Sequence, residues 1–307
     1  MKLIKPVFWS EKNLLSFLLY PLTLFTFLFN LIKGFSSKKK FFLKTICIGN
    51  IYVGGTGKTP LSIKINKILK KKYKTVFIKK KYLNQYDEQK LLEANGNLIC
   101  TDDRSISLKI AQNQNYDVAL IDDGLQEKSI KYDISIACFN SSAGIGNGFL
   151  LPSGPLRENI SEIKNYDAIF LNGERKNLKL SLLFKNINKD LRIFEAQYVP
   201  INIKNFNRKR NFLIFSGIGN PEEFERTLKK NKFKIREKLI YPDHYKFSSA
   251  DINKIKKIAK NKKLDIITTE KDYYRLNKKN KKNIKFLKIE LKIKNIKKFL
   301  QFLKESL

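Results

Sequence analysis

A glycine-rich turn between an apolar run and a helical pattern is the feature that most constrains this chain. The apolar run covers residues 45–48, and the helical pattern begins at Pro60. Glycines in such a turn let backbone N–H groups surround phosphate oxygens, and a lysine at its end reaches the terminal phosphates. The sequence therefore predicts a strand, a phosphate-binding loop and a helix, with Thr59 as a ligand of Mg²⁺. The expected loop consists of Val53, Gly54, Gly55, Thr56, Gly57, Lys58, Thr59 and Pro60.

A second motif, an apolar run that ends in an acidic residue, supports this interpretation. The strict loop pattern places a glycine five residues before Gly57, where this chain has Tyr52, so a glycine-rich hairpin turn remains the alternative. Residues 118–121, however, form an apolar run that ends in Asp122. A parallel sheet places a metal-binding carboxylate at this edge of a buried strand, which makes Asp122 the predicted Mg²⁺ ligand. Its own alternative is a polar turn that closes a strand.

With these two motifs the chain resembles the tetraacyldisaccharide 4'-kinases of lipid A biosynthesis. The resemblance covers nearly the whole chain in order and spacing. It is carried by the residues Gly49-Asn50, Val53 to Pro60, Asp122-Asp123-Gly124-Leu125-Gln126, Gly146-Asn147-Gly148, Leu151 to Glu158, Pro242-Asp243-His244 and Thr269-Glu270-Lys271-Asp272.

The resemblance implies an ATP- and Mg²⁺-dependent kinase whose acceptor is an acylated glucosamine disaccharide lipid. Lys58 would contact the phosphates, and Asp87 with His244 would act as the base for the sugar hydroxyl, each from a different domain. A lone histidine is more often structural, but His244 follows an expected strand in a loop beside an acid. The expected supporting residues are Asp123, Gln126, Arg157 and Glu158.

Two segments depart from the family pattern. The family usually carries Ser-Arg-Gly-Tyr where this chain has Lys79-Lys80-Lys81-Tyr82, and Gly-Asp-Glu-Pro where it has Tyr86-Asp87-Glu88-Gln89. A divergent kinase and a relative with a changed acceptor both fit these departures. Arg157-Glu158 has a plain alternative as well, a surface ion pair worth under about 1 kcal/mol, but beside an anionic substrate Arg157 is better interpreted as an electrostatic clamp.

The amino-acid composition limits the possible partners and metal sites. The formal charge of +34 invites a nucleic-acid-binding interpretation, but the lysines are spread along the chain and no recognition motif is present. We therefore expect no nucleic acid partner, and no feature implies an obligate protein partner. The three cysteines, Cys47, Cys100 and Cys138, have no zinc-site spacing and are expected to be reduced thiols.

The N-terminal segment is apolar. Residues 14–32 carry no charged side chain, and a helix over them at ~1.5 Å per residue reaches about 29 Å, close to the hydrocarbon thickness of a bilayer. Pro21 and Asn30 interrupt the pattern, so a helix lying in the membrane plane is the alternative. Lys33 and residues 38–40, all lysines, favour a cytoplasmic kinase body. We expect contact with membrane lipids at the cytoplasmic face of the inner (plasma) membrane.

The predicted fold is α/β, a P-loop NTPase-like α/β/α sandwich with a second, smaller α/β domain and an N-terminal hydrophobic helix. Expected ranges are 1–40 for the membrane-associating helix, 41–195 for the kinase domain and 196–307 for the smaller domain. A membrane-associated switch ATPase or GTPase is the alternative from another class, because it shares the phosphate loop and the Asp122 strand. Two motifs favour the kinase, Leu151 to Glu158 and Asp243-His244, since a switch needs no base in a second domain.

Overall fold

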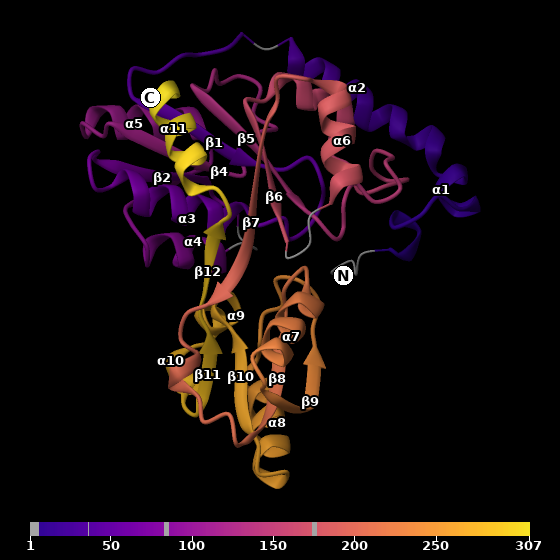
Figure 1. The fold of residues 1–307 in the computed structure, drawn as a ribbon, viewed down its shortest axis with the longest axis vertical. Coiled ribbons are helices and arrows are strands. Elements are labelled where there is room, and N and C mark those ends of the chain that lie inside the picture. Colours follow the sequence, from indigo (N-terminus) through magenta and orange to yellow (C-terminus); the bar gives the residue numbers. More distant parts are fainter. Residues whose placement is uncertain (1–5, 36, 83–85, 174–176) are drawn as a thin grey trace. The chain divides into compact units, whose positions relative to one another are not determined.

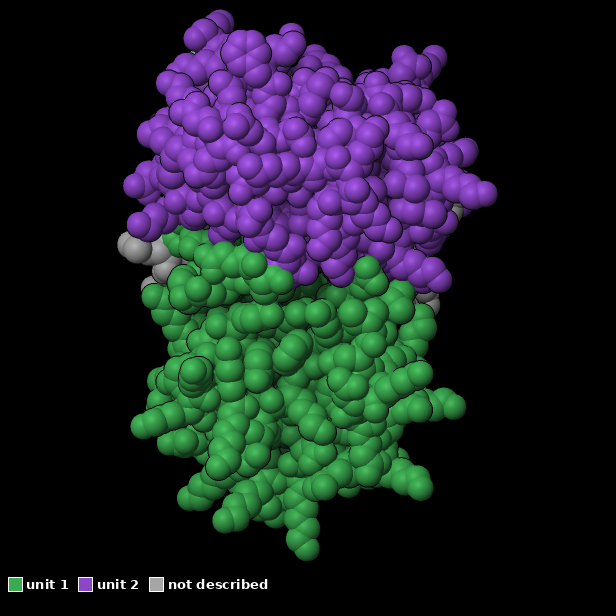
Figure 2. Space-filling view, turned by 90° about the vertical axis from the view of Figure 1, so that its left-hand side faces the viewer, with its two compact units in different colours: residues 1–4, 82–94, 199–290 green, residues 5–81, 95–198, 291–307 purple. Residues whose placement is uncertain are grey.

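The computed structural model describes residues 6–35, 37–82, 86–173 and 177–307. The chain forms two compact units (Figure 2). The larger unit contains residues 5–81, 95–198 and 291–307, and the smaller contains 1–4, 82–94 and 199–290. The predicted domain ranges stay a prediction. In the compact units, residues 86–94 group with the smaller unit and residues 291–307 with the larger one.

A mostly parallel sheet forms the centre of the larger unit (Figure 1). Its strand order is β12-β7-β6-β5-β1-β4-β2-β3, and β1 pairs in parallel with both β4 and β5. The connections from the adjacent strands β1 and β4 run in opposite directions along the sheet, to β2 and to β5 respectively, so the loop that follows β1 lies where α/β folds bind ligands. The strands are β1 (Lys44–Gly49), β2 (Thr75–Lys80), β3 (Leu98–Thr101), β4 (Val118–Asp122), β5 (Ile134–Asn140), β6 (Ala168–Asn172), β7 (Arg192–Pro200) and β12 (Ile289–Ile293).

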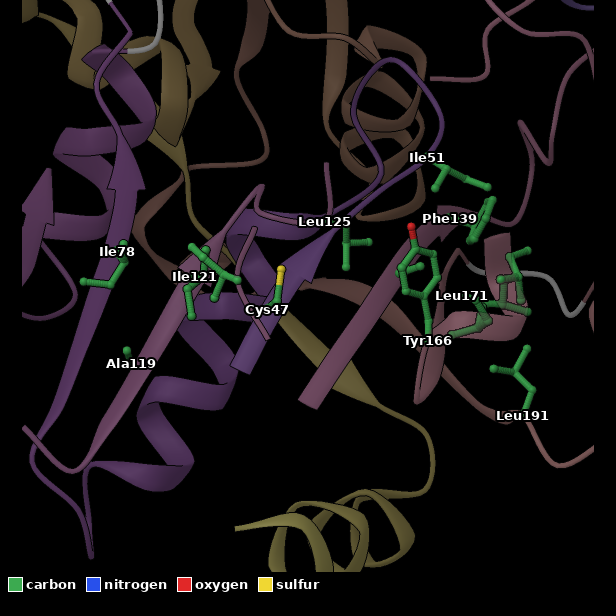
Figure 3. Packing of buried hydrophobic residues seen from close by; sticks show 14 of the residues in the cluster. Cys47, Ile51, Ile78, Ala119, Ile121, Leu125, Phe139, Tyr166, Leu171 and Leu191 are labelled. Carbon is green, nitrogen blue, oxygen red and sulfur yellow. The ribbon is translucent and has the colours of Figure 1, made fainter. Parts of the chain in front are cut away.

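Helices cover both faces of this sheet. On one face, Cys47, Ile121 and Phe139 pack in one cluster with side chains from α5 (Arg104–Asn113) and α6 (Leu178–Ile187) (Figure 3). On the other face, Phe170 meets Phe299 of α11 (Ile296–Ser306) at 5.9 Å between ring centroids. The connection from β1 to β2 through α3 (Lys58–Leu69) runs opposite to that from β3 to β4 through α5, which places α3 on the face of α11. The predicted α/β/α sandwich is confirmed.

The N-terminal segment differs from the expected single helix. Residues 14–32 form α1 (Leu14–Leu18), a 3-10 turn η2 (Tyr20–Leu22) and α2 (Thr23–Gly34). The break falls at Pro21, because proline lacks the N–H that a continuing helix requires and clashes with the preceding turn. Among the described residues, no helix combines the length and the apolarity needed to cross a membrane. Residues 1–5 and 36 of the expected 1–40 segment lie outside the described residues.

The smaller unit is built on a four-stranded parallel sheet of order β11-β10-β8-β9. Helix α8 covers one face through Ile252 and Ile255, and α7 covers the other through Phe224. The strands are β8 (Asn211–Ser216), β9 (Lys234–Ile240), β10 (Asp265–Thr269) and β11 (Ile284–Leu287). The helices are α4 (Tyr86–Glu93), α7 (Pro221–Lys230), α8 (Ser249–Asn261), α9 (Glu270–Arg275) and α10 (Lys278–Lys281), and short 3-10 turns elsewhere in the chain are η1 (Val7–Trp9), η3 (Ile160–Asn165) and η4 (Ile203–Asn205).

Candidate active site

The phosphate loop connects β1 to α3 as the sequence predicts. Gly57 precedes the first residue of α3 with φ of 92°, a left-handed conformation that glycine adopts without strain. A Cβ at Gly57 would lie 2.7 Å from Nδ2 of Asn172 and 2.8 Å from the hydroxyl of Tyr198, so the position is also too tight for a side chain. The first N–H groups of α3 have no partner within the helix, so the loop and the helix start together can bind an anion.

Lys58 is held near the carboxyl edge of the sheet by two oxygen groups. Its Nζ donates to Oδ1 of Asn50 at 3.2 Å and lies 3.6 Å from Oδ1 of Asp123. The backbone carbonyl of Asn50 in turn accepts a bond from Nε2 of Gln126 at 2.9 Å. Residues from the loop after β1, the start of α3 and the turn after β4 thus form one connected group around the lysine.

Asp122 is buried at the end of β4 and binds three partners. Its Oδ2 accepts from the hydroxyl of Thr59 at 3.1 Å, and its Oδ1 accepts from the hydroxyl of Ser62 at 3.1 Å. The third partner is Lys79, whose Nζ lies 2.9 Å from Oδ2 and whose side chain is 1% exposed. Thr59 and Asp122, the two predicted metal ligands, are therefore adjacent, and the buried ammonium beside them belongs to the segment that departs from the family pattern.

Asp123 and Arg157 form the rim of this group. Asp123 has φ of 61°, and its carbonyl accepts a 2.7 Å bond from the guanidinium of Arg104. Nη1 of Arg157 donates to Oδ1 of Asp123 at 3.2 Å and to Oε1 of Gln126 at 3.2 Å. The predicted residues Lys58, Asp123, Gln126 and Arg157 are thus brought together.

Glu158 points to different partners. Its carboxylate accepts a 2.6 Å bond from the hydroxyl of Tyr166 and pairs with Nζ of Lys128 at 3.0 Å. Burial, followed by the negative charge of Glu158, raises the pKa of Tyr166. Glu158 is therefore buried against the side chains of Tyr166 and Lys128, and neither partner belongs to the group around Lys58.

A charged cluster in the smaller unit contains the predicted base. Nδ1 of His244 lies 3.2 Å from Oδ1 of Asp87. The second oxygen of Asp87 pairs with the guanidinium of Arg275 at 2.7 Å, and Lys271 Nζ lies 3.4 Å from it. Lys271 also pairs with Glu88 at 2.9 Å and lies 3.4 Å from Nε2 of His244. Asp87 is therefore fixed by a histidine on one oxygen and by cations on the other.

The electrostatics of this cluster keep Asp87 ionised. Burial by itself works to raise the pKa of Asp87, but the bond to His244 and the two neighbouring cations outweigh it and hold the pKa well below its usual range. Burial works to lower the pKa of Lys271, but the surrounding carboxylates outweigh it and raise that pKa. A charged carboxylate that accepts from Nδ1–H leaves Nε2 as the basic nitrogen of His244.

The predicted ranges assign Asp87 and His244 to different domains, whereas the compact units group the two residues together. Both residues belong to the smaller compact unit, because α4, which carries Asp87, packs against α9 of that unit. Helix α9 begins within the Thr269-Glu270-Lys271-Asp272 motif and supplies Lys271 and Arg275. Asp272 holds Arg275 in place with a 2.6 Å ion pair and accepts from the N–H of Gly217 at 3.1 Å.

Comparisons with known proteins identify the family. A family model described as tetraacyldisaccharide-1-P 4'-kinase matches residues 15–307. The chain belongs to this family.

Individual relatives agree with the family model. The tetraacyldisaccharide 4'-kinase of Pelagibacter ubique is 49% identical over 298 residues, covering 95% of both chains, and that of Rickettsia canadensis is 35% identical over 315 residues, covering 96% of this chain and 95% of the relative. The crystal structure of LpxK from Aquifex aeolicus in complex with ATP has a TM-score of 0.72, is 21% identical and covers 95% of this chain and 99% of that one. At this identity the likeness supports the fold.

Family membership favours the kinase over the switch and nucleic-acid-binding alternatives. Four basic residues of the two groups were not predicted as site residues. Lys271 was quoted only as part of a motif, and Lys79 only as a departure from one. Arg275 follows the Asp272 motif position by three residues, the spacing at which helical side chains meet, and that spacing is a signal that could have found it. Arg104 begins a helix far from Asp123 in the sequence, and no local pattern indicates their contact.

Proposed function

We propose that this chain is an ATP-dependent kinase that phosphorylates the 4'-hydroxyl of tetraacyldisaccharide 1-phosphate and forms lipid IVA in lipid A biosynthesis. The family match over residues 15–307 supports the reaction class and the substrate. The observation that carries the mechanism is the 3.2 Å contact between His244 and Asp87, because phosphorylation of a hydroxyl requires a proton acceptor.

The larger unit fits ATP. The buried hydroxyl of Thr56 and the buried amide of Asn172, whose side chain lies against the loop at Gly57, have no hydrogen-bond partner among the described residues. Such unsatisfied buried groups are costly unless a ligand binds them. Lys58 and the N–H groups of 54–59 would bind the phosphates.

Thr59 and Asp122 fit Mg²⁺. Mg²⁺ is usually held by one or two protein oxygens together with phosphate oxygens and waters, and these two side chains present oxygens 3.1 Å apart. The described residues contain no cluster of three or more acidic, histidine or cysteine side chains that could hold a metal by themselves. Mg²⁺ would neutralise charge on the β- and γ-phosphates, and Lys79 would keep the carboxylate of Asp122 in position.

The smaller unit would deprotonate the acceptor. The 4'-oxygen attacks the γ-phosphorus, the bond from that phosphorus to the bridging oxygen breaks, and ADP leaves with the electron pair. The hydroxyl proton passes to Nε2 of His244, and Asp87 stabilises the imidazolium that results. Arg275 holds Asp87 ionised for this purpose, and Lys271, 3.4 Å from Nε2, would move aside when the hydroxyl binds.

Membrane attachment is the second part of the proposal. Large apolar side chains of α1 and α2 are exposed, including Leu14 at 87%, Phe25 at 73% and Ile32 at 70%. Exposed apolar patches of this kind mark interaction surfaces, and the substrate carries four acyl chains. The segment would bind the cytoplasmic face of the inner membrane, with membrane lipids as its partners.

The single tryptophan reports on this attachment. Trp9 lies in η1, just before α1. Its fluorescence is expected to shift to shorter wavelength when vesicles of anionic lipid are added, and Phe25→Ser is expected to weaken the response. An unchanged spectrum, with protein remaining in the supernatant after vesicle sedimentation, would contradict the attachment.

Label transfer tests the reaction and the base together. Detergent-solubilised protein is incubated with labelled ATP, Mg²⁺ and the tetraacyl disaccharide 1-phosphate. Wild type is expected to label the lipid, and Asp87→Asn and His244→Gln to lower kcat by about a hundredfold or more. Asp190→Asn, an exposed position outside both units' charged groups, is the matched control. Equal rates for all variants would refute the base assignment, and no labelling by wild type would refute the kinase.

A further inference from the structure

Helix α2 has a reversed pattern of polarity. Its least exposed side chains are polar: Thr23 is buried, and Thr26 and Asn30 are half-buried. Phe25 and Ile32, by contrast, are 73% and 70% exposed. Positions 23, 26 and 30 are spaced by three and four residues, so these side chains lie on one helix face. The polar face of α2 therefore packs on the protein, and the apolar face points away from it.

Hydrogen bonds join this polar face to the segment 149–157, which ends at Arg157. The hydroxyl of Thr26 donates to the carbonyl of Leu151 at 2.7 Å, and Nδ2 of Asn30 donates to the carbonyl of Arg157 at 2.7 Å. In the preceding helix α1, the carbonyl of Ser16 accepts a bond from the hydroxyl of Ser153. Asn30, which interrupts the apolar pattern in the sequence, thus has a defined partner.

The same segment is bonded on its other side to the phosphate loop. The N–H of Arg157 donates to the carbonyl of Ile51 at 2.7 Å, and the N–H of Val53 donates to the carbonyl of Pro155 at 2.9 Å. Tyr52 and Leu156 form an isolated antiparallel bridge between these bonds. The backbone of Arg157 therefore binds the phosphate loop through its N–H and α2 through its carbonyl.

We propose that Asn30 and Thr26 are positioning residues for phosphoryl transfer. Asn30 holds the backbone of Arg157 and Thr26 holds the same segment at Leu151, so that the guanidinium of Arg157 reaches Asp123 and Gln126. Helix α2 then has two separate functions: its apolar face binds lipid, and its polar face sets the position of a residue in the nucleotide site. The inference rests on the proposed role of Arg157 in that site. It does not require that the acceptor be the disaccharide lipid.

A merely structural role for Asn30 makes a different prediction. If the amide only satisfies a buried carbonyl, Asn30→Leu lowers the stability of the segment and leaves the affinity of the folded protein for ATP unchanged. If the amide positions Arg157, the variant loses nucleotide affinity, and the loss depends on the guanidinium. Double-mutant cycles separate the two cases, because residues that act through one another are not additive.

The experiment measures the dissociation constant of a fluorescent ATP analogue, without lipid acceptor, for full-length variants in detergent. Asn30→Leu is expected to weaken binding about fivefold or more, as for a lost bond to a buried carbonyl, whereas in an Arg157→Leu background the same change is expected to alter binding by less than about twofold. Thr26→Val is expected to act in the same direction and Thr26→Ser to retain wild-type affinity. Asn113→Leu, at an exposed position of α5, is the matched control.

Three results would overturn the proposal: unchanged affinity in Asn30→Leu, an equal loss in the presence and absence of Arg157, or an equal loss in Asn113→Leu. Thermal unfolding of each variant verifies that the measured protein is folded, and vesicle binding of Asn30→Leu is expected to be no weaker than that of wild type, since leucine is more apolar. Because binding is measured without acceptor, a wild type that binds ATP but fails to label the lipid refutes the proposed kinase and still tests this inference.

Discussion

Replacement of Lys79 by methionine tests the buried ion pair in the phosphate site. The ammonium lies 2.9 Å from Oδ2 of Asp122, and both side chains are almost inaccessible, 1% and 0% exposed. Removing one partner of such a pair costs about 3–5 kcal/mol, because the remaining charge is buried without compensation. Asp122 keeps its bonds from the hydroxyls of Thr59 and Ser62, so we expect the lower end, about 3 kcal/mol, which is more than a hundredfold in the unfolding equilibrium.

The assay is urea denaturation of ligand-free protein, followed by circular dichroism. Lys79→Met is expected to lower the free energy of unfolding by about 3 kcal/mol, and Lys81→Met, at an exposed position next to β2, by less than about 0.5 kcal/mol. Lys79→Met combined with Asp122→Asn is expected to recover part of the loss, since it removes the uncompensated charge. A single variant as stable as wild type, or a double variant whose losses simply add, would refute the reasoning.

Two further predictions concern Arg275 and Gly57. Arg275→Met removes a cation that lowers the pKa of Asp87, so that this pKa rises toward its unfolded value and an ionised Asp87 contributes less stability. Urea midpoints are therefore expected to be lower than those of wild type at pH 7, with a difference that shrinks as pH falls below about 4, where Asp87 of the unfolded chain is protonated. A difference that stays the same from pH 7 to pH 3 would contradict this. Gly57→Ala forces a Cβ to 2.7 Å from Asn172 at a positive φ, so its affinity for ATP is expected to drop at least about tenfold, whereas Gly34→Ala, where a Cβ meets nothing within 4 Å, should bind normally.

Local sequence patterns predicted the strand, loop and helix around Gly57 and the place of Asp122 at the end of a strand; the ligands of these residues stay a prediction. Gly57, Lys58 and Thr59 follow an apolar strand at fixed spacing, and Asp122 ends another, so the parallel sheet brings them together without any long-range information. The pairing of Asp87 with His244 required the resemblance to a family, because 157 residues separate the two and no periodic pattern links them.

Other features depend on packing that the sequence does not display. Helix α4 belongs to the smaller compact unit although its neighbours in the chain belong to the larger one, and only the contact of α4 with α9 reveals this. The apolar N-terminal segment was expected to form one helix, but the break at Pro21 and the inward polar face of α2 give it a different form. Lys79 appeared as a departure from a motif, and its function as the partner of Asp122 follows only from its burial.

The position of the new phosphate on the product tests the central claim most directly. Wild-type protein is incubated with ATP, Mg²⁺ and the tetraacyl disaccharide 1-phosphate, and the lipid product is isolated and examined by ³¹P NMR and mass spectrometry. The account predicts one added phosphate, present as a monoester on the 4'-oxygen, with the 1-phosphate unchanged. A lipid that gains no phosphate, or a diphosphate at position 1, would contradict it.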